Sequence, residues 1–193
     1  MGVAFRSSST TGTSDAEVAS IAVPVPSGAA ANDIALVAIE QWQSTSTNPT
    51  VTPPAGFTQI VDINLDADQG WQRLKVFWKR LSGADSGSYT FTWTGAQWSQ
   101  GQAMLITGAK TTGDPIGANV NTATAAAPTT STPTTTLSGL TFQPFLANFV
   151  ANESSSTQTP PTNFTETQEA NYLKSNYRIP GATGTFSASG GTL

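Results

Sequence analysis

The stretch TPPAGFTQI at residues 52–60 recurs later in the chain as TPPTNFTET at residues 159–167. The segments around the two copies also match in pairs: DIALVAIE (33–40) with LANFVANE (146–153), LKVFW (74–78) with LKSNY (173–177), and SYTFTWT (88–94) with TGTFSAS (183–189). The alternative is chance recurrence in a Thr-rich chain. Because a unit of four or five strands cannot bury its apolar face alone, two such units packed face to face predict a sandwich built from a duplicated unit.

Short runs rich in Val, Ile, Thr and aromatic residues, separated by Gly, Pro, Asn and Asp, predict strands throughout the chain. No stretch shows the 3.6-residue apolar period of a helix. The Pro-Pro pair in each copy lacks two N–H donors and therefore marks a strand entry or an edge. We expect an all-β fold, a two-sheet antiparallel sandwich.

We expect one domain over residues 1–193, because sandwiches of about this length commonly form a single core. Its parts are a first half at about 18–120, a connector at about 121–139 and a second half at about 140–193. The connector is small, uncharged and rich in Thr and Pro, and part of it can pair as an edge strand.

The two halves differ in one element. QGQAMLITGAK (100–110) predicts a buried strand in the first half, whereas the second half ends at SGGTL (189–193). A bare strand edge is a pairing template, so either the chain is truncated or a neighbouring subunit donates the missing strand.

Composition excludes several classes of function. The net charge of −4 and the pI near 4.5 provide no positive field for nucleic acid. The chain has no Cys and no His, which removes the commonest general base and two common metal ligands. Neither a signal peptide nor an apolar run of about 20 residues is present, so we expect synthesis in the cytoplasm and no membrane insertion.

Carboxylates cluster only in DINLDAD (62–68), which contains Asp62, Asp66 and Asp68. Three carboxylates are candidate Ca²⁺ ligands, but the segment lacks the Gly and distal Glu of an EF-hand loop, and a solvated turn is the alternative. No cofactor is expected. A paired-carboxylate hydrolase remains a distant alternative to a non-enzymatic protein.

Basic residues concentrate in the segment RLKVFWKR (73–80), where they alternate with Leu74, Val76 and Trp78. This alternation predicts a strand with one wet face that carries Arg73, Lys75 and Lys79. An ordinary charged solvent face explains the pattern, and a docking stripe for an acidic partner is the sharper hypothesis.

Five Trp residues raise the question of sugar stacking. Trp78 and Trp93 follow the apolar alternation and are predicted core residues. Trp42, Trp71 and Trp98 lie near predicted strand ends among Gln and Ser, and are the candidates for a glycan-binding surface. The alternative is that they are partly buried packing residues.

The succession VPVPSGAAANDIALVAIE (23–40), PPAGFTQI (53–60), LKVFWKRLSGADSGSYTFTWT (74–94) and ITGAKTTGDPIG (106–117) resembles a jelly-roll-like module of minor tail and surface structural proteins of tailed bacteriophages. The likeness extends from about residue 7 to the end. It implies a virion component made in the host cytoplasm, with other capsid or tail proteins as partners and no catalytic residues. Members of this family continue with one more apolar strand, which this chain lacks.

We therefore expect a non-enzymatic virion structural protein, either a capsid decoration protein or a small tail-associated protein, present in many copies or as a homo-oligomer. The alternative is a receptor- or glycan-binding module at a tail tip or on a bacterial surface.

Overall fold

The computed structural model describes residues 2–11, 14, 16–43, 48–64, 72–116, 120, 131–137, 144–151, 159–161, 163–170, 172–180 and 184–189. Strands make up its regular structure: β1 (Ala4–Thr10), β2 (Val18–Pro24), β3 (Ile34–Trp42), β4 (Thr58–Asn64), β5 (Arg73–Arg80), β6 (Ser88–Thr107), β7 (Ser131–Leu137), β8 (Leu146–Ala151), β9 (Thr165–Ala170), β10 (Leu173–Arg178) and β11 (Gly184–Ser189). The described residues form no helix, and so none that is long and apolar enough to cross a membrane. The all-β antiparallel sandwich expected from the sequence is confirmed.

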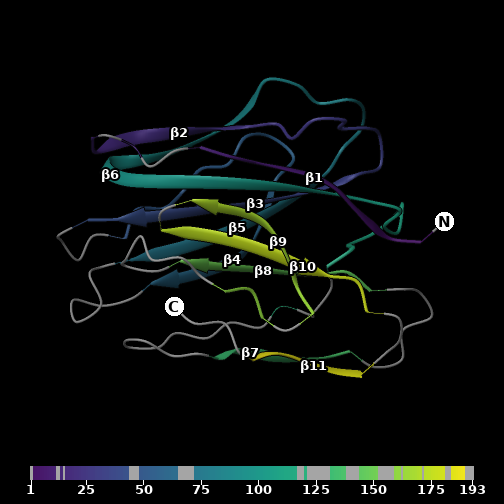
Figure 1. Ribbon diagram of the computed structural model, residues 1–193. Helices are drawn as coiled ribbons and strands as arrows, with labels where there is room; N and C mark the ends of the chain where they lie inside the picture. The colour runs from purple at the N-terminus through teal and green to yellow at the C-terminus, as the bar shows by residue number, and fades with distance from the viewer. Residues whose placement is uncertain are drawn as a thin grey trace.

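The strands form layers, with one ribbon at the top of Figure 1 and another at the bottom. The first ribbon pairs β2 with the beginning of β6. The main sheet, in the order β1-β6-β3-β5-β4, packs against this ribbon on one face and against a second sheet, in the order β8-β10-β9, on the other. A second ribbon, β7 with β11, lies lowest. β7 falls within the predicted connector, part of which does pair as a strand.

β6 belongs to two layers. Its first part, from Ser88, pairs with β2, and its second part, from Trp98 onward, pairs with β3 and β1. Gly95 lies at the interruption of the pairing with β2, between Thr92 and Gln97, and has a φ of 84°, a backbone conformation that residues with a Cβ rarely adopt. The partner of β6 changes from β2 to β3 between Gln97 and Trp98, shortly after this glycine.

The first core lies between the first ribbon and the main sheet. The ribbon contributes Val23, Phe91 and Trp93, and the main sheet contributes Val37 and Phe77. Full burial of a Val, Leu or Phe side chain typically stabilises the fold by about 1.5–3 kcal/mol. This core is the largest apolar cluster in the described part of the chain.

The opposite face of the main sheet packs against the second sheet. Leu74 and Val76 of β5 contact a cluster that includes Leu173 of β10 and Phe149 of β8. Both faces of the main sheet are therefore covered over much of its area. The two units meet face to face through their sheets, as the duplication predicts.

The duplication is visible in the strand pairing. β4 pairs with β5 as β9 pairs with β10, and in both pairs one residue of the outer strand is bulged, Ile60 in the first and Thr167 in the second. Two residues after each bulge an acidic residue faces a lysine: Asp62 lies opposite Lys75, and Glu169 lies opposite Lys174. The sequence repeat is thus a structural repeat with the same register and the same bulge.

The turns of the two TPP copies also correspond. The N–H of Phe57 donates to the carbonyl of Pro54, and the N–H of Phe164 donates to the carbonyl of Pro161. The third residue of the turn has a positive φ in both copies, 88° at Gly56 and 66° at Asn163. Gly and Asn are the residues that a type II turn favours at this position. The repeated motif therefore encodes a turn that leads into the bulged outer strand.

Candidate functional site

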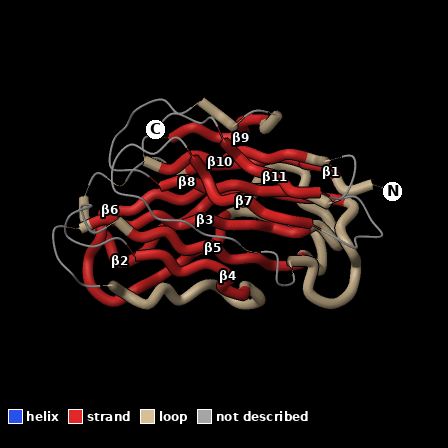
Figure 2. The backbone as a smooth tube through the Cα atoms, turned by 90° about the horizontal axis from the view of Figure 1, so that it is seen from below, coloured by secondary structure: helices blue, strands red, loops and turns tan. Residues whose placement is uncertain are grey.

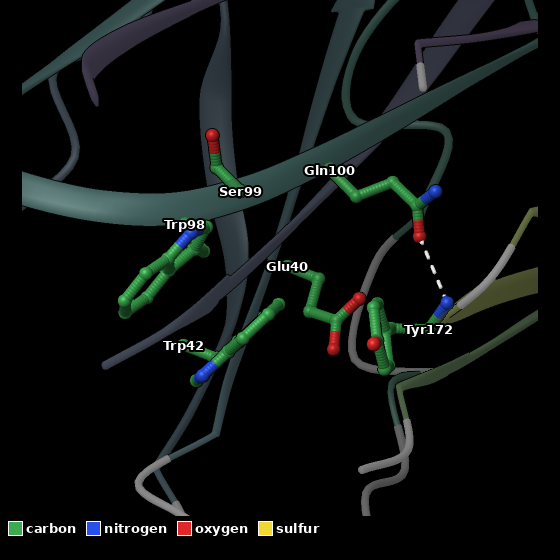
Figure 3. Close-up of a pocket in the computed structure, with 6 residues that line it drawn as sticks. All are labelled: Glu40, Trp42, Trp98, Ser99, Gln100 and Tyr172. Atoms are coloured by element: carbon green, nitrogen blue, oxygen red, sulfur yellow. Dashed lines mark hydrogen bonds between the residues drawn. The ribbon is translucent and has the colours of Figure 1, made fainter. Parts of the chain in front are cut away.

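A crevice lies where the two repeats meet. Figure 3 shows its lining: Glu40 and Trp42 from β3, Trp98, Ser99 and Gln100 from β6, and Tyr172 from the turn between β9 and β10. The crevice is partly open to solvent and is too narrow to hold a water molecule.

Three aromatic rings form one wall of the crevice. Trp42 and Trp98 are directly opposite each other on β3 and β6, and their rings stack at 5.0 Å between centroids and 15° between planes. Tyr172 contacts Trp42 at 5.0 Å with a tilt of 57°. The half-buried Trp42 is thus in ring contact with both Trp98 and Tyr172, and the three rings link the main sheet to the β9–β10 turn.

Glu40 lies at the inner end of the crevice and is only 2% exposed. Its Oε1 accepts a hydrogen bond from Nε2 of Gln72 at 2.6 Å, whereas its Oε2 has no hydrogen-bond partner among the described residues. Burial raises the pKa of Glu40 to about 8, against the smaller lowering effects of the Gln72 hydrogen bond and the charge of Lys174. At neutral pH the side chain is therefore a neutral carboxylic acid that can donate a hydrogen bond.

Buried amides hold the second repeat against the first. Oε1 of Gln100 accepts from the backbone N–H groups of Tyr172, at 3.1 Å, and Leu173, at 2.8 Å. Nε2 of Gln102 donates to the carbonyl of Leu173 at 2.5 Å. Two Gln side chains on β6 thus satisfy backbone groups at the start of β10, which would otherwise be buried without partners.

The chemistry available in this crevice is limited. Ring faces and edges offer apolar contact, and Glu40 offers one donor or one proton. Among the lining residues Glu40 is the single carboxyl group, so the crevice does not supply the carboxylate pair of a glycosidase. The arrangement suits recognition or structural closure.

The prediction that Arg73 and Lys75 lie on a solvent face is wrong. Arg73 is 2% exposed and Lys75 is 1% exposed, because β5 is a central strand of a sheet that is covered on both sides. Leu74, Val76 and Trp78 face the second sheet, and the alternate side chains turn towards the first core. β5 was expected to expose one face to solvent, but both of its faces are covered by other layers.

The basic side chains are instead paired inside the protein. Arg73 donates to Oε1 of Gln97 at 3.1 Å, and burial lowers its pKa. Lys75 donates to Asp62 at 2.5 Å and to Oδ1 of Asn48 at 3.2 Å.

Lys79, about one fifth exposed, pairs with Asp85 at 2.8 Å and lies over the rings of Phe57 and Tyr89. An acidic partner would therefore find two of the three predicted docking residues, Arg73 and Lys75, buried.

Other predicted site residues are only partly visible. Trp71, Asp66 and Asp68 lie outside the described residues. Asp62 is the one described member of the carboxylate cluster, and it binds Lys75. No group of three metal-ligating side chains occurs within the described ranges.

The sequence analysis missed Glu40 and Tyr172. Glu40 interrupts the apolar run IALVAIEQW of β3, and a charged residue in a continuous apolar strand is the signal that could have drawn attention to it. Tyr172 had no comparable signal, because its role depends on contact between the two repeats. Comparisons of the chain with models of protein families, with curated proteins and with solved structures found no match.

Proposed function

We propose that this protein is a non-enzymatic structural component on the surface of a tailed-bacteriophage particle, a capsid decoration protein or a small tail-associated protein. Support comes from the resemblance of its motifs to phage surface modules and from the duplicated β unit. The observation that carries the proposal is the structural repeat: β9 pairs with β10 as β4 pairs with β5, with a bulge at the equivalent residue, so the chain consists of two packed copies of one β unit. Two packed β units without a pair of catalytic carboxylates in the described crevice suit a scaffold protein.

Repetition would make attachment to a particle effective. A particle presents many equivalent positions, and many copies multiply weak contacts into stable binding. Assembly would take place in the host cytoplasm, and the mature location would be the virion. Other capsid or tail subunits are the expected partners.

Two measurements test the proposal. Sedimentation equilibrium across the micromolar range gives the oligomeric state of the purified chain, and co-sedimentation measures its attachment to phage particles assembled without it. We expect saturable attachment with many copies per particle. Failure to attach to particles, together with turnover of any substrate, would overturn the proposal.

The second candidate function is a receptor- or glycan-binding module, and the crevice favours it. Trp42, Trp98 and Tyr172 gather in one partly exposed cluster, and aromatic rings with an apolar body and a polar handle are suited to contact with sugar rings. The test is glycan binding followed by intrinsic fluorescence. Trp98→Ala should abolish binding, whereas Trp78→Ala, which removes another partly buried indole of the main sheet away from the crevice, should retain it.

A further inference from the structure

Lys75 holds an amine inside the protein, on the face of β5 that turns towards the first core. Its side chain is 1% exposed, and its strand neighbours Leu74 and Val76 point to the opposite face. Figure 2 shows β5 beside β4, the last strand of the main sheet. The long side chain of Lys75 therefore ends near the margin of the sheet, where other segments can reach its Nζ atom.

Two side chains of different chemistry meet this amine. Oδ1 of Asp62, which lies opposite Lys75 on β4, is 2.5 Å from Nζ, and Oδ1 of Asn48 accepts a hydrogen bond from Nζ at 3.2 Å. The second carboxylate oxygen of Asp62 accepts from Nε2 of Gln59 at 3.0 Å. A buried amine, a carboxamide and a carboxylate thus converge at one point.

These three groups are the ones that an amide exchange between side chains requires. An amine attacks a carbonyl carbon only after it has lost a proton, and a carboxylate in contact with the amine can take that proton. The carbonyl carbon of Asn48, Cγ, is one bond away from the oxygen that Nζ contacts. A small rotation at the end of the flexible Lys75 side chain moves Nζ from Oδ1 to Cγ, into the range of about 3–3.5 Å from which reactions start.

The exposure of the three groups also suits the exchange. Nζ of Lys75 belongs to a buried side chain, whereas Asn48 is exposed and the Asp62 side chain is 44% exposed. The ammonia that is displaced from the carboxamide therefore has a path to solvent. Its dilution there makes the exchange irreversible in practice.

The residue after Asn48 closes the reaction that would compete. Asn side chains commonly lose ammonia when the backbone N–H of the next residue attacks Cγ, but Asn48 is followed by Pro49, which has no N–H. This ring closure is therefore blocked at Asn48. Loss of ammonia from this side chain needs another nucleophile, and Lys75 is in contact with it.

We propose that Lys75 and Asn48 form an intramolecular amide bond in the folded protein, with Asp62 as the catalytic carboxylate. Asp62 accepts a proton from the Lys75 ammonium group, and the lone pair of Nζ forms a bond to Cγ of Asn48. The bond between Cγ and Nδ2 breaks with its electron pair on nitrogen, which takes one proton from Asp62 and one from Nζ and leaves as an ammonium ion. Asp62 is a carboxylate again at the end.

The bond would join two layers of the first repeat. Asn48 lies shortly before Val51, which is part of the first core, and before Thr52, which pairs with Thr92 in the first ribbon. Lys75 belongs to the main sheet. A covalent link across this core closes a loop over residues 48–75 and stabilises the fold by restricting the unfolded chain. Before the reaction, Lys75 and Asp62 are the ion pair that the structure shows.

The second repeat provides an internal comparison. Lys174 and Glu169 lie opposite each other as Lys75 and Asp62 do. The residue four positions before the TPP motif, however, is Asn48 in the first copy and Ser155 in the second. Because Ser has no carbonyl carbon to attack, we expect the bond in the first repeat alone. This chemistry is independent of the proposed function.

Peptide mass spectrometry of the purified, folded chain tests the proposal. Trypsin does not cleave after an amidated lysine, so residues 7–73 should stay joined to residues 74–79, with a mass lower than the sum of the two peptides by one ammonia. Cleavage after Lys174 should proceed normally. A joined peptide that has lost water instead would place the bond at Asp62 and overturn the assignment. A free peptide 7–73 after prolonged incubation of the folded chain would overturn the proposal.

Matched variants assign the electrophile. Asn48→Ser introduces the residue of the second repeat at an exposed position and should yield separate peptides. Asn64→Ser makes the same change at another exposed position and should retain the joined peptide. A joined peptide in Asn48→Ser would contradict the role of Asn48.

A second pair of variants assigns the carboxylate. Asp62→Ala keeps the amine and the carboxamide but removes the proton acceptor, so the joined peptide should be lost. Glu169→Ala removes the equivalent acid of the second repeat and should retain it. A native unfolding transition in urea shows that each variant is folded. Equal yields of the joined peptide in the two variants would contradict the role of Asp62.

Discussion

Replacing Glu40 by Gln isolates the effect of one buried carboxyl group on the pH dependence of folding. Burial raises the pKa of Glu40 from 4.5 to about 8 in the folded protein. Between these two values the folded protein holds a proton that the unfolded chain has lost. Stability therefore falls as the pH rises through this window, because the folded state binds more protons than the unfolded state.

The size of the effect follows from the two pKa values. One pKa unit corresponds to about 1.4 kcal/mol, so the free energy of unfolding falls by about 5 kcal/mol across the window, of which about 3 kcal/mol has been lost by pH 7. Glu40→Gln keeps the acceptor for Gln72 and is always neutral. We expect the variant to be more stable than the unsubstituted protein by about 3 kcal/mol at pH 7, with the gap closing towards pH 4.5.

The assay is urea unfolding followed by Trp fluorescence, from about pH 5 to about pH 8, for the unsubstituted protein and the variant. Glu17→Gln is the control, since it makes the same chemical change outside the crevice. Only Glu40→Gln should flatten the dependence of the unfolding free energy on pH. Parallel curves for Glu40→Gln and the unsubstituted protein would refute the assignment of a neutral carboxylic acid at this position.

Three further predictions concern the repeat and its packing. Asp62→Asn should lower the unfolding free energy by about 1–3 kcal/mol, because it weakens the 2.5 Å ion pair with the buried ammonium group of Lys75. Glu169→Gln should lower it by less than about 1 kcal/mol, since Glu169 and Lys174 are 3.7 Å apart. Equal losses for the two variants in urea unfolding would contradict this ranking. Gly101→Ala should cost about 1–3 kcal/mol, because the new Cβ would lie 2.5 Å from Cγ2 of Val23, whereas Gly83→Ala, with no atom within 4 Å, should be nearly neutral in the same assay. Gly56→Ala should cost about 1 kcal/mol at its positive φ, and Gly56→Asn should cost less because Asn occupies the equivalent position 163; thermal unfolding that ranks them in the opposite order would contradict the turn assignment.

Local pattern was sufficient to predict the strands and the duplication. The pairs of matched segments became pairs of equivalent strands, and Gly56 and Asn163 took the same place in equivalent turns. Such features depend on residues close together in the chain, where turn chemistry and alternation act directly. The direction of the alternation in β5 was also correct, with Leu74 and Val76 together on one face.

Features that depend on a third layer were not predictable in this way. The exposure of Arg73 and Lys75 was wrong because alternation distinguishes the two faces of a strand without saying whether both are covered. The crevice required Tyr172 to meet Trp42, and these residues belong to different repeats. Trp42 and Trp98 were selected as surface aromatics, yet their cross-strand stacking follows from the register of β3 and β6.

The long β6 strand also determines when the fold can form during synthesis. β1 pairs with the end of β6, with Ala4 opposite Thr107, so β1 gains its partner among the described strands only after almost the whole first repeat has emerged from the ribosome. Contacts between residues so distant in sequence slow folding, because the intervening chain loses entropy before the contact forms. β2 also pairs with β6, whereas β3 pairs with β5 as well. The nascent chain therefore carries β1 and β2 without their strand partner over a long stretch of translation, and the emergence of β6 is the step that brings both into the first repeat.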